Sequence, residues 1–432
     1  MAVLLESPYP APADFPQISR YSVCAGAPRR LDGKTQLWTP PIGQILPLLA
    51  QLQQQGKNSS IDYPGNLPFT GGWLGWLGYD LAWEIERLPI LNSDPLPFPV
   101  ACWYEPAAFA VLDHAEQVLW LATTIPEELE RLEAQLDADF IPSLIHSTNS
   151  SPSHLRFLSS SADYQQAVER AKQYIQAGDI FQANLSLRFQ ATVTADSWSI
   201  YRRLQTINPS PFACYWQSPW GVLISCSPER LVQLQGSMAQ TRPIAGTRPR
   251  GKTPQQEQQL AEELVTSVKD RAEHIMLVDL ERNDLGRVCE WGSVVVDELL
   301  MVERYSHVMH LVSNVRGTLR PPNNTVDLIR ALFPGGTITG CPKVRCLEII
   351  EELEPVRRSL FYGSCGYLDW RGNLDLNILI RTLLLAREGK AMIPRYRVWG
   401  QVGAGIVADS DPEWEWQESL HKAEAQFAAL QI

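Results

Sequence analysis

The chain has 432 residues, of which 45% are hydrophobic and 20% charged, and it contains 14 Trp, 13 Tyr and 12 Phe. The aromatic residues supply ample surface to bury, which excludes disorder as the main state, and the length predicts two or three domains or one large core. The formal net charge of −11 argues against nucleic acid as a partner, because proteins that neutralise phosphates are basic.

The sequence also argues against a membrane or secreted location. No uninterrupted apolar run reaches the roughly 20 residues of a membrane-spanning helix. The first residues lack the basic region of a secretory signal and the Arg-rich character of a transit peptide, so a cytoplasmic protein is expected. The eight cysteines show neither a CxxC pair nor zinc-ligand spacing, and they are predicted to be buried, free thiols in a reducing compartment.

Composition divides the chain into two regions and a connection. Residues 1–144 hold most of the Pro and Trp and include strand-like runs at 21–26 and 114–125. Residues 145–163 are rich in Ser, His and Asn and lack apolar periodicity, which predicts a linker or a long exposed loop. Residues 164–432 alternate strands and helices, as expected for the catalytic region of an enzyme.

The predicted elements of the second region follow from apolar spacing and from helix start and stop signals. They are a helix that ends at Gly178, a strand at 221–227, one long helix at 255–278, a strand at 396–408, and a final helix that begins near Pro412. This mixture of elements predicts an α/β or α+β fold.

Two of the predicted helices each carry a pair of acidic residues three positions apart. One pair is Asp270 and Glu273, and the other is Glu415 and Glu418. This spacing places both carboxylates of a pair on one face of a helix. Four carboxylates from two helices are suited to a hard divalent cation such as Mg²⁺, whereas the alternative is two solvated acidic faces.

Glycine-rich segments occur at 243–251, 333–345 and 401–409. None matches a nucleotide-binding fingerprint, so a nucleotide site is not predicted. Gly403 and Gly405 could offer backbone amides to a carboxylate, although ordinary turn glycines are an equal alternative.

A single arginine, Arg381, interrupts the apolar run ILIRTLLL. An arginine in such a run is usually buried against an anion or an acidic partner. It is therefore the best candidate to bind an anionic ligand, with a structural ion pair as the alternative. The residues alone thus predict a small anionic substrate, a divalent metal and acid–base chemistry.

Several long motifs, in one order, resemble those of the chorismate-utilising enzymes, namely component I of anthranilate synthase and of aminodeoxychorismate synthase. The matching stretches are GDIFQANLSLRF (178–189), SPER (227–230), TRPIAGTRPRG (241–251), KDRAEHIMLVDLERNDLGR (269–287), SHVMHLVS (306–313), FPGGTITGCPKVR (333–345), RTLLL (381–385) and GAGIVADSDPEWEWQES (403–419). The resemblance implies a sandwich of two large antiparallel sheets flanked by helices.

The resemblance also implies roles for the acidic pairs. Glu273 and Glu418 would be the Mg²⁺ ligands, with Asp270 and Glu415 in support. The metal would hold the ring carboxylate of chorismate.

Further residues receive substrate-binding roles from the same resemblance. Arg381 and the amides around Gly403 and Gly405 would bind the enolpyruvyl carboxylate, and Thr337 and Tyr367 are assigned to the same substrate site.

The catalytic group implied by the resemblance centres on Glu229, which would act near the C4 hydroxyl as a general acid. His310 would lie against the reacting ring, with Thr247 in the same group. Ala245 stands at the position where known aminodeoxychorismate enzymes have a lysine. Because hydroxide is a poor leaving group, an acid must protonate it, so the pKa of Glu229 must be raised.

The identity of the nucleophile and the product depends on a few positions. Water-using relatives carry a lysine base where this chain has Gln182, so ammonia is the expected nucleophile. FPGGTITG and Asn184 favour an aminodeoxychorismate synthase, which would serve p-aminobenzoate and folate synthesis. Ala245, in PIAGT, favours an anthranilate synthase, and that alternative stays open.

LLES (4–7) resembles the element that lines a tryptophan pocket in this family, with Ser7, Pro211 and Phe212 as wall residues. Ala213 departs from the usual feedback-site pattern, so a bound tryptophan could be structural. Relatives usually have some tens of residues before this element, which suggests either an upstream start codon or a missing first strand. The chain lacks a glutaminase motif, so a separate glutamine amidotransferase subunit is the expected partner.

Overall fold

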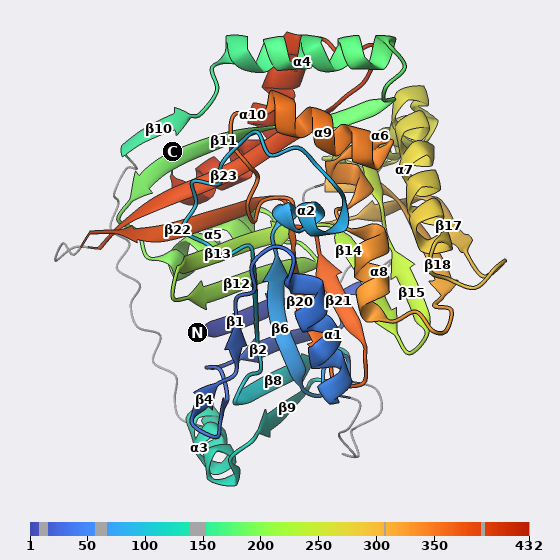
Figure 1. Ribbon diagram of the computed structural model, residues 1–432. Helices are drawn as coiled ribbons and strands as arrows, with labels where there is room; N and C mark the ends of the chain where they lie inside the picture. The colour runs from blue at the N-terminus through green and yellow to red at the C-terminus, as the bar shows by residue number, and fades with distance from the viewer. Residues whose placement is uncertain (8–15, 57–66, 138–152, 306–307, 390–393, 432) are drawn as a thin grey trace.

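The computed structural model describes residues 1–7, 16–56, 67–137, 153–305, 308–389 and 394–431. Within these residues the chain forms two large antiparallel sheets flanked by helices, which confirms the predicted fold class (Figure 1). No described helix is long and apolar enough to cross a membrane.

The first sheet contains 11 strands among the described residues. In spatial order they are β10 (Ser153–Phe157), β11 (Gln182–Val193), β23 (Arg395–Ile406), β22 (Thr382–Glu388), β13 (Gly221–Ser227), β12 (Phe212–Ser218), β1 (Ala2–Glu6), β2 (Tyr21–Ala25), β8 (Ala108–Asp113) and β9 (Val118–Thr123), with β19 (Gly340–Cys341) paired to β11.

The second sheet contains 10 strands in the same described part of the chain. Their order is β16 (Ile244–Pro249), β18 (Val308–Thr318), β15 (Met238–Thr241), β14 (Arg230–Gln235), β21 (Leu374–Asn377), β20 (Ser364–Asp369), β6 (Gly72–Leu77), β7 (Ala101–Tyr104) and β5 (Leu37–Trp38), with β17 (Val295–Arg304) paired to β18. A short hairpin joins β3 (Arg30–Leu31) and β4 (Lys34–Thr35). Residues 1–144 and 164–432 contribute strands to both large sheets.

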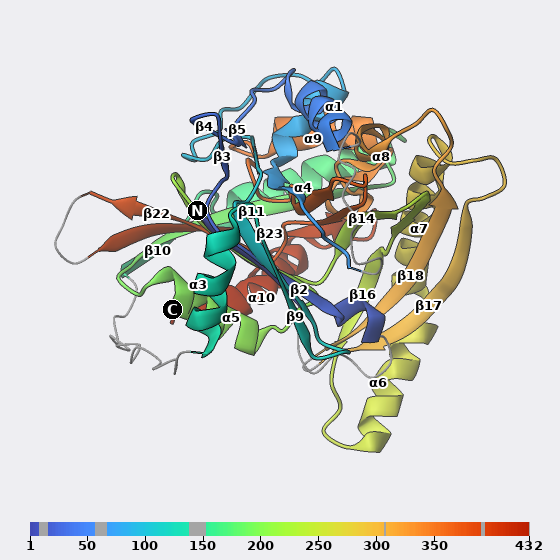
Figure 2. The same cartoon turned by 90° about the horizontal axis from the view of Figure 1, so that it is seen from below.

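The helices lie outside the sheets. They are α1 (Ile45–Gly56), α2 (Ala82–Ile85), α3 (Pro126–Asp137), α4 (Ser161–Gln176), α5 (Ser197–Ile207), α6 (Pro254–Thr266), α7 (Val268–Gly286), α8 (Thr325–Leu332), α9 (Lys343–Leu353) and α10 (Pro412–Leu430), with short 3₁₀ helices η1 (Pro16–Ser19), η2 (Tyr79–Leu81) and η3 (Gly336–Ile338). Helices α4, α5, α9 and α10 contact the first sheet or one another, and α6 and α7 pack on β16 and β18 (Figure 2).

The core between the two sheets is dominated by aromatic side chains. Trp76 of β6 and Trp216 of β12 meet edge to face across the sandwich, with ring centroids 5.4 Å apart. Tyr104 of β7 makes a second edge contact with Trp216, at 6.0 Å. All three side chains are buried, so this cluster joins strands of both sheets.

We predict that Trp216→Ala lowers the free energy of unfolding by about 3–5 kcal/mol, because it removes a large buried ring and leaves a cavity. Urea unfolding followed by circular dichroism measures this effect. Trp291→Ala is the matched control, since Trp291 is 93% exposed. Equal stability of the two variants would contradict the prediction.

The single long helix predicted at 255–278 is wrong. Two helices, α6 and α7, meet at Ser267, whose φ and ψ of −59° and 115° interrupt the helical path. Ser267 caps α7, because its side chain accepts a hydrogen bond from the backbone N–H of Asp270. The break places Asp270 and Glu273 at the start of a new helix.

The strand predicted at 396–408 is confirmed as β23, in which Gly403 and Gly405 pair with β11. Two smaller predictions need correction. Part of the predicted linker forms β10, which pairs with β11. Cys24 is exposed, whereas the other cysteines are buried or partly buried; all eight are free.

Candidate functional site

Glu273 lies on α7 and faces the end of β23. Its Oε1 accepts a hydrogen bond from Nε2 of Gln182, at 3.1 Å. A Cβ at Gly405 would lie 2.5 Å from that same nitrogen and 3.4 Å from the Glu273 carboxylate. A larger residue at 405 would therefore displace the Gln182 side chain from Glu273.

Glu418 on α10 is tied to the same strand by a lysine. Nζ of Lys422 contacts the Glu418 carboxylate at 2.8 Å and donates to the carbonyl oxygen of Gly403 at 3.0 Å. Burial opposes ionisation of Glu418, but the charge and hydrogen bond of Lys422 and the charge of Lys269 together outweigh it and hold the pKa of Glu418 below its usual value. Sequence reasoning missed Lys422, although its position four residues after Glu418 on a helix was a usable signal.

The two supporting acids have different partners. Asp270 forms an ion pair with Arg248, at 2.8 Å. Glu415 is buried, and burial raises its pKa, with a further contribution from the charge of Glu418. The Asp270 carboxylate is thus paired with the Arg248 guanidinium, which suits a supporting residue rather than a direct metal ligand.

The chemistry of Glu273 and Glu418 fits Mg²⁺. Burial raises the pKa of Glu273, and the negative charge of Glu418 raises it further, so the two carboxylates share one electrostatic environment. No three acidic, His or Cys side chains of the described residues gather into a complete metal cage. Mg²⁺ commonly uses one or two protein carboxylates and completes its shell with water and substrate oxygens, so two carboxylates suffice.

Arg381 has no carboxylate partner among the described residues. Its Nη1 donates to Oδ1 of Asn208, at 2.7 Å, and burial lowers its pKa. Its φ of 50° is a strained backbone conformation for a side chain of this size. The alternative of a structural ion pair is therefore not found, and the guanidinium remains available to an anion.

Arg381 directly precedes β22, and the neighbouring strand β23 has one edge that β22 does not cover. Pairing between β22 and β23 runs only from Leu383–Gly400 to Glu388–Arg395, so residues 401–406 pair with β11 alone. Tyr362 approaches this segment: its hydroxyl would lie 3.0 Å from a Cβ at Gly403. Oε1 of Gln182 and Oδ1 of Asn184 are buried and have no hydrogen-bond partner in the described ranges. Unpartnered buried polar atoms on neighbouring segments indicate a polar ligand.

Glu229 follows β13 and is 5% exposed. Burial raises its pKa to about 8, while Thr337 and the Ile244 backbone favour the ionised form and the charge of Glu281 opposes it. A carboxyl group with this pKa is protonated near neutral pH and can donate a proton. Thr337 belongs to η3, within the glycine-rich segment 333–345.

His310 and Thr247 face each other across the pairing of β16 with β18. Nδ1 of His310 and the Thr247 hydroxyl are 2.9 Å apart. Burial lowers the pKa of His310 to about 3, and the nearby charge of Arg381 adds to the effect, so the imidazole is neutral. Ala245 is buried on β16 opposite Leu311 and offers no nucleophile.

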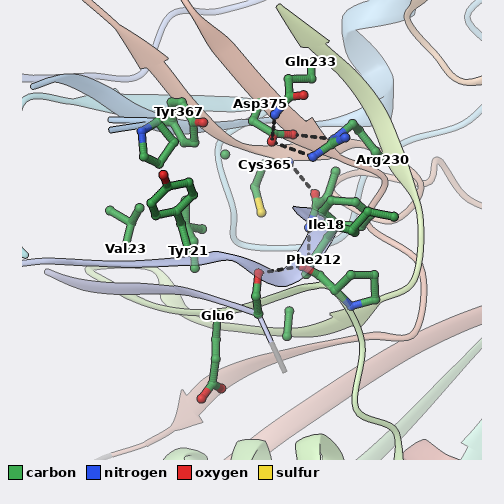
Figure 3. Close-up of a pocket in the computed structure, with 17 residues that line it drawn as sticks. Glu6, Ile18, Tyr21, Val23, Phe212, Arg230, Gln233, Cys365, Tyr367 and Asp375 are labelled. Atoms are coloured by element: carbon green, nitrogen blue, oxygen red, sulfur yellow. Dashed lines mark hydrogen bonds and ion pairs between the residues drawn. The ribbon is translucent and has the colours of Figure 1, made fainter. Parts of the chain in front are cut away.

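A cavity of about 110 Å³ lies between the two sheets, apart from the residues described so far (Figure 3). It is lined by Ser7, Pro211 and Phe212, which were predicted as one pocket, and the Ser7 hydroxyl donates to the Pro211 carbonyl at 3.2 Å. Tyr367 also lines this cavity and packs on Phe69 with ring centroids 5.4 Å apart.

The placement of Tyr367 corrects its assignment to the substrate site. Tyr367 lies on β20 and points into the cavity beside Tyr21 and Arg230 (Figure 3). Tyr362, five residues earlier, is the tyrosine that approaches Gly403. Its φ of 62° turns the chain before β20, and no sequence signal distinguishes the two tyrosines.

Comparisons with known proteins show the family of this chain. The profile of the chorismate binding enzyme family matches residues 5–428. The chain is 62% identical to an "anthranilate synthase component I-like protein" of Synechocystis, over 100% of this chain and 87% of that protein. It is 45% identical to aminodeoxychorismate synthase component 1 of Bacillus subtilis, over 84% of this chain and 78% of that protein.

A solved structure shows the same fold. The crystal structure of anthranilate synthase component I from Streptococcus pneumoniae superposes with a TM-score of 0.80 and 31% identity, over 94% of this chain and 92% of that one. With the family profile spanning nearly all 432 residues, this chain belongs to the chorismate binding enzymes.

Proposed function

We propose that the protein is the chorismate-binding component of an aminodeoxychorismate synthase, which converts chorismate and ammonia to 4-amino-4-deoxychorismate and water. The observation that carries the proposal is the buried carboxyl group of Glu229, whose raised pKa suits a proton donor. It is joined by Arg381, which lacks a carboxylate partner in the described residues and whose charge acts on His310, and by two helices with acidic pairs. A general acid, an anion site and a metal site are what this chemistry requires.

The reaction assigns a task to each group. As the ammonia nitrogen bonds to the ring, the C4–O bond breaks and Glu229 gives its proton to the departing oxygen, which leaves as water. The Arg381 guanidinium and the open edge of β23 would bind the enolpyruvyl carboxylate. Neutral His310 would lie against the ring. Mg²⁺, held by Glu273 and Glu418, would withdraw charge from the ring carboxylate.

Ammonia is the proposed nucleophile because position 182 is a glutamine, which cannot deprotonate water. Its amide nitrogen is already engaged with Glu273. The expected source of ammonia is a separate glutamine amidotransferase subunit, and free ammonia should replace it at high pH.

Relationships among the similar proteins support a role in p-aminobenzoate synthesis. Synechocystis has, besides the 62% identical relative, a protein named anthranilate synthase component 1 that is only 40% identical to this chain. The closer relative is thus a second protein of that organism, distinct from its named anthranilate synthase.

Anthranilate synthase is the second candidate, favoured by Ala245. At this position no lysine adduct with the substrate can form, and the chain is 44% identical to anthranilate synthase component 1 of Thermus thermophilus. The two products differ in whether pyruvate is released.

Product analysis separates the candidates. The purified chain is incubated with chorismate, Mg²⁺ and an ammonium salt, and products are resolved by chromatography. An amino product that yields p-aminobenzoate only after a lyase is added, without earlier pyruvate, supports the proposal. Anthranilate with equimolar pyruvate would overturn it in favour of the second candidate, and no consumption of chorismate would overturn both.

We further propose that the cavity between the sheets binds tryptophan as a structural ligand. Aromatic and polar walls are both present, because Tyr21 lies opposite the Arg230–Asp375 ion pair, whose Nε–Oδ1 distance is 2.9 Å (Figure 3). Ala213, at the wall, departs from the pattern of feedback sites. Calorimetric titration with tryptophan, followed by an inhibition assay, tests binding and regulation separately.

We predict that Arg381→Leu raises KM for chorismate about 10- to 100-fold, because charge-assisted hydrogen bonds to an anion contribute roughly 1.5–3 kcal/mol. Steady-state kinetics over a range of chorismate concentrations measure the change. Arg381→Lys should recover part of the loss. Arg282→Leu is the matched control, since Arg282 is exposed and paired with Asp279. An unchanged KM in Arg381→Leu would contradict the role.

A further inference from the structure

A second buried carboxyl group, that of Glu281, lies close to Glu229 and has no task in the proposed reaction. Glu281 is 4% exposed and lies on α7, two turns beyond Glu273. Its carboxylate interacts with the backbone N–H of Gly336 and with the side chain of Thr241, but burial still dominates and raises its pKa. Burying a carboxyl group is costly, and the proposed reaction gives this one no role.

The turn that begins η3 connects the two carboxyl groups. The backbone N–H of Gly336 approaches Oε1 of Glu281, at 3.4 Å, and the next residue, Thr337, interacts with Glu229. A Cβ at Gly336 would lie 2.5 Å from Leu280 and 3.3 Å from the Glu281 carboxylate. Glycine at 336 therefore lets the turn lie directly on α7, with Glu281 and Glu229 against consecutive residues of it.

A largely buried ion pair, Asp284–Lys343, lies next to Glu281. Asp284 follows Glu281 by three residues, on the same side of α7, and contacts Nζ of Lys343 on α9 at 2.5 Å. The side chains of Asp284 and Lys343 are 7% and 12% exposed, so they lie at the border of solvent. The pKa of Glu281 is affected by the charges of Asp284 and Lys343. The charge of Glu281 in turn affects the pKa of Glu229.

The protonation states of these groups suit proton exchange. Burial raises the pKa of Glu281 to about 7, and the charge of Asp284 raises it further while Lys343 lowers it. Burial also raises the pKa of Glu229, to about 8. Both carboxyl groups can therefore carry a proton near neutral pH, and either can pass one to the other.

We propose that Glu281 supplies the proton that Glu229 loses in each turnover. After Glu229 has protonated the departing oxygen, the O–H bond of Glu281 breaks and an O–H bond forms on Glu229. Solvent then returns a proton to Glu281 on the side of the Asp284–Lys343 pair, and the proton released to solvent by the new C–NH3⁺ group, as it becomes the amine, balances this uptake. Glu281 acts through Glu229 and is a positioning and proton-supply residue; the inference rests on the proposed function, in which Glu229 is the general acid.

The test compares the first turnover with later ones in Glu281→Gln. This variant keeps an acceptor for Gly336 and cannot transfer a proton. Because the first turnover uses the proton already on Glu229, its rate should stay within about twofold of the parent, whereas steady-state kcat should fall about tenfold or more. Glu281→Asp should restore part of kcat. Equal losses in both phases, or no loss in either, would overturn the proposal.

Asp279→Asn is the matched control, because it removes one negative charge from the same helix at a side chain that is 67% exposed. It should change neither phase. A parent chain that does not consume chorismate would refute the proposed function, and a second measurement then decides the fate of Glu281. In infrared difference spectra across pH of about 6 to 9, the parent should lose carboxylic acid bands from two groups. Glu281→Gln should lose one band and shift the other to lower pH; an unshifted remaining band would overturn the pairing.

Discussion

Replacing Glu229 with Gln is expected to lower kcat by about 10²- to 10⁴-fold, because the variant has no proton to give to the departing oxygen. The amide has nearly the same shape and fits the same buried space. Chorismate consumption and product formation, measured at saturating ammonia, report the loss. The effect is expected for either product, since the C4–O bond breaks in both reactions.

Two measurements distinguish lost chemistry from a lost fold in Glu229→Gln. Calorimetry should show chorismate binding within a few-fold of the parent, because Arg381 and the β23 edge are intact. Stability should also lose part of its pH dependence. The pKa of Glu229 is raised from 4.5 to about 8 by burial, so the folded state binds more protons than the unfolded state between these values.

The sign of this effect follows from linkage. Since the unfolded state binds fewer protons in this window, the free energy of unfolding of the parent falls as pH rises from 4.5 to about 8. The free energy of unfolding of Glu229→Gln lacks this contribution and should fall less over the same pH range. Activity of the parent, corrected for the ammonia concentration, should likewise decline as pH rises through about 8. A variant with parental kcat would refute the role of Glu229.

The acidic pairs show what could be predicted from the sequence. Helical spacing alone placed Asp270 beside Glu273 and Glu415 beside Glu418, and it was sufficient because helix geometry fixes neighbours three residues apart. The prediction survived the division of the long helix, since Ser267 caps α7 before the first acid. Which acids face each other across α7 and α10 depends on packing that spacing does not encode.

Tyr362 and Glu281 show what the sequence could not reveal. Tyr362 and Tyr367 stand in one glycine-rich stretch, and only the positive φ of Tyr362 and the start of β20 separate their environments. Glu281 lies in the polar run LERND and resembles a solvated helical residue. It is buried because the Gly336 turn, 55 residues away in sequence, packs directly on α7.

The second large effect is expected from Glu418→Gln, which should lower Mg²⁺-dependent kcat/KM by about 10²-fold or more. The variant removes one of two carboxylates that share one electrostatic environment, and metal stabilisation of a developing charge is worth several kcal/mol. Raising the Mg²⁺ concentration should recover part of the activity. Kinetics over a wide Mg²⁺ range, together with calorimetric Mg²⁺ binding, measure the change.

Glu424→Gln is the control for this prediction. Glu424 lies on the same helix, α10, and its side chain is 68% exposed and paired only with His421 among the described residues. The two variants carry the same charge change, so a general effect of charge on Mg²⁺ affinity would appear in both. A loss in Glu418→Gln alone therefore assigns the effect to the site.

Glu418 has two roles that must be separated, metal binding and the placement of Lys422, which its carboxylate holds against Gly403. Lys422→Met removes only the second role. If this variant reproduces the loss of activity without weakening Mg²⁺ binding, Glu418 acts only by placing the lysine and its assignment as a metal ligand is wrong.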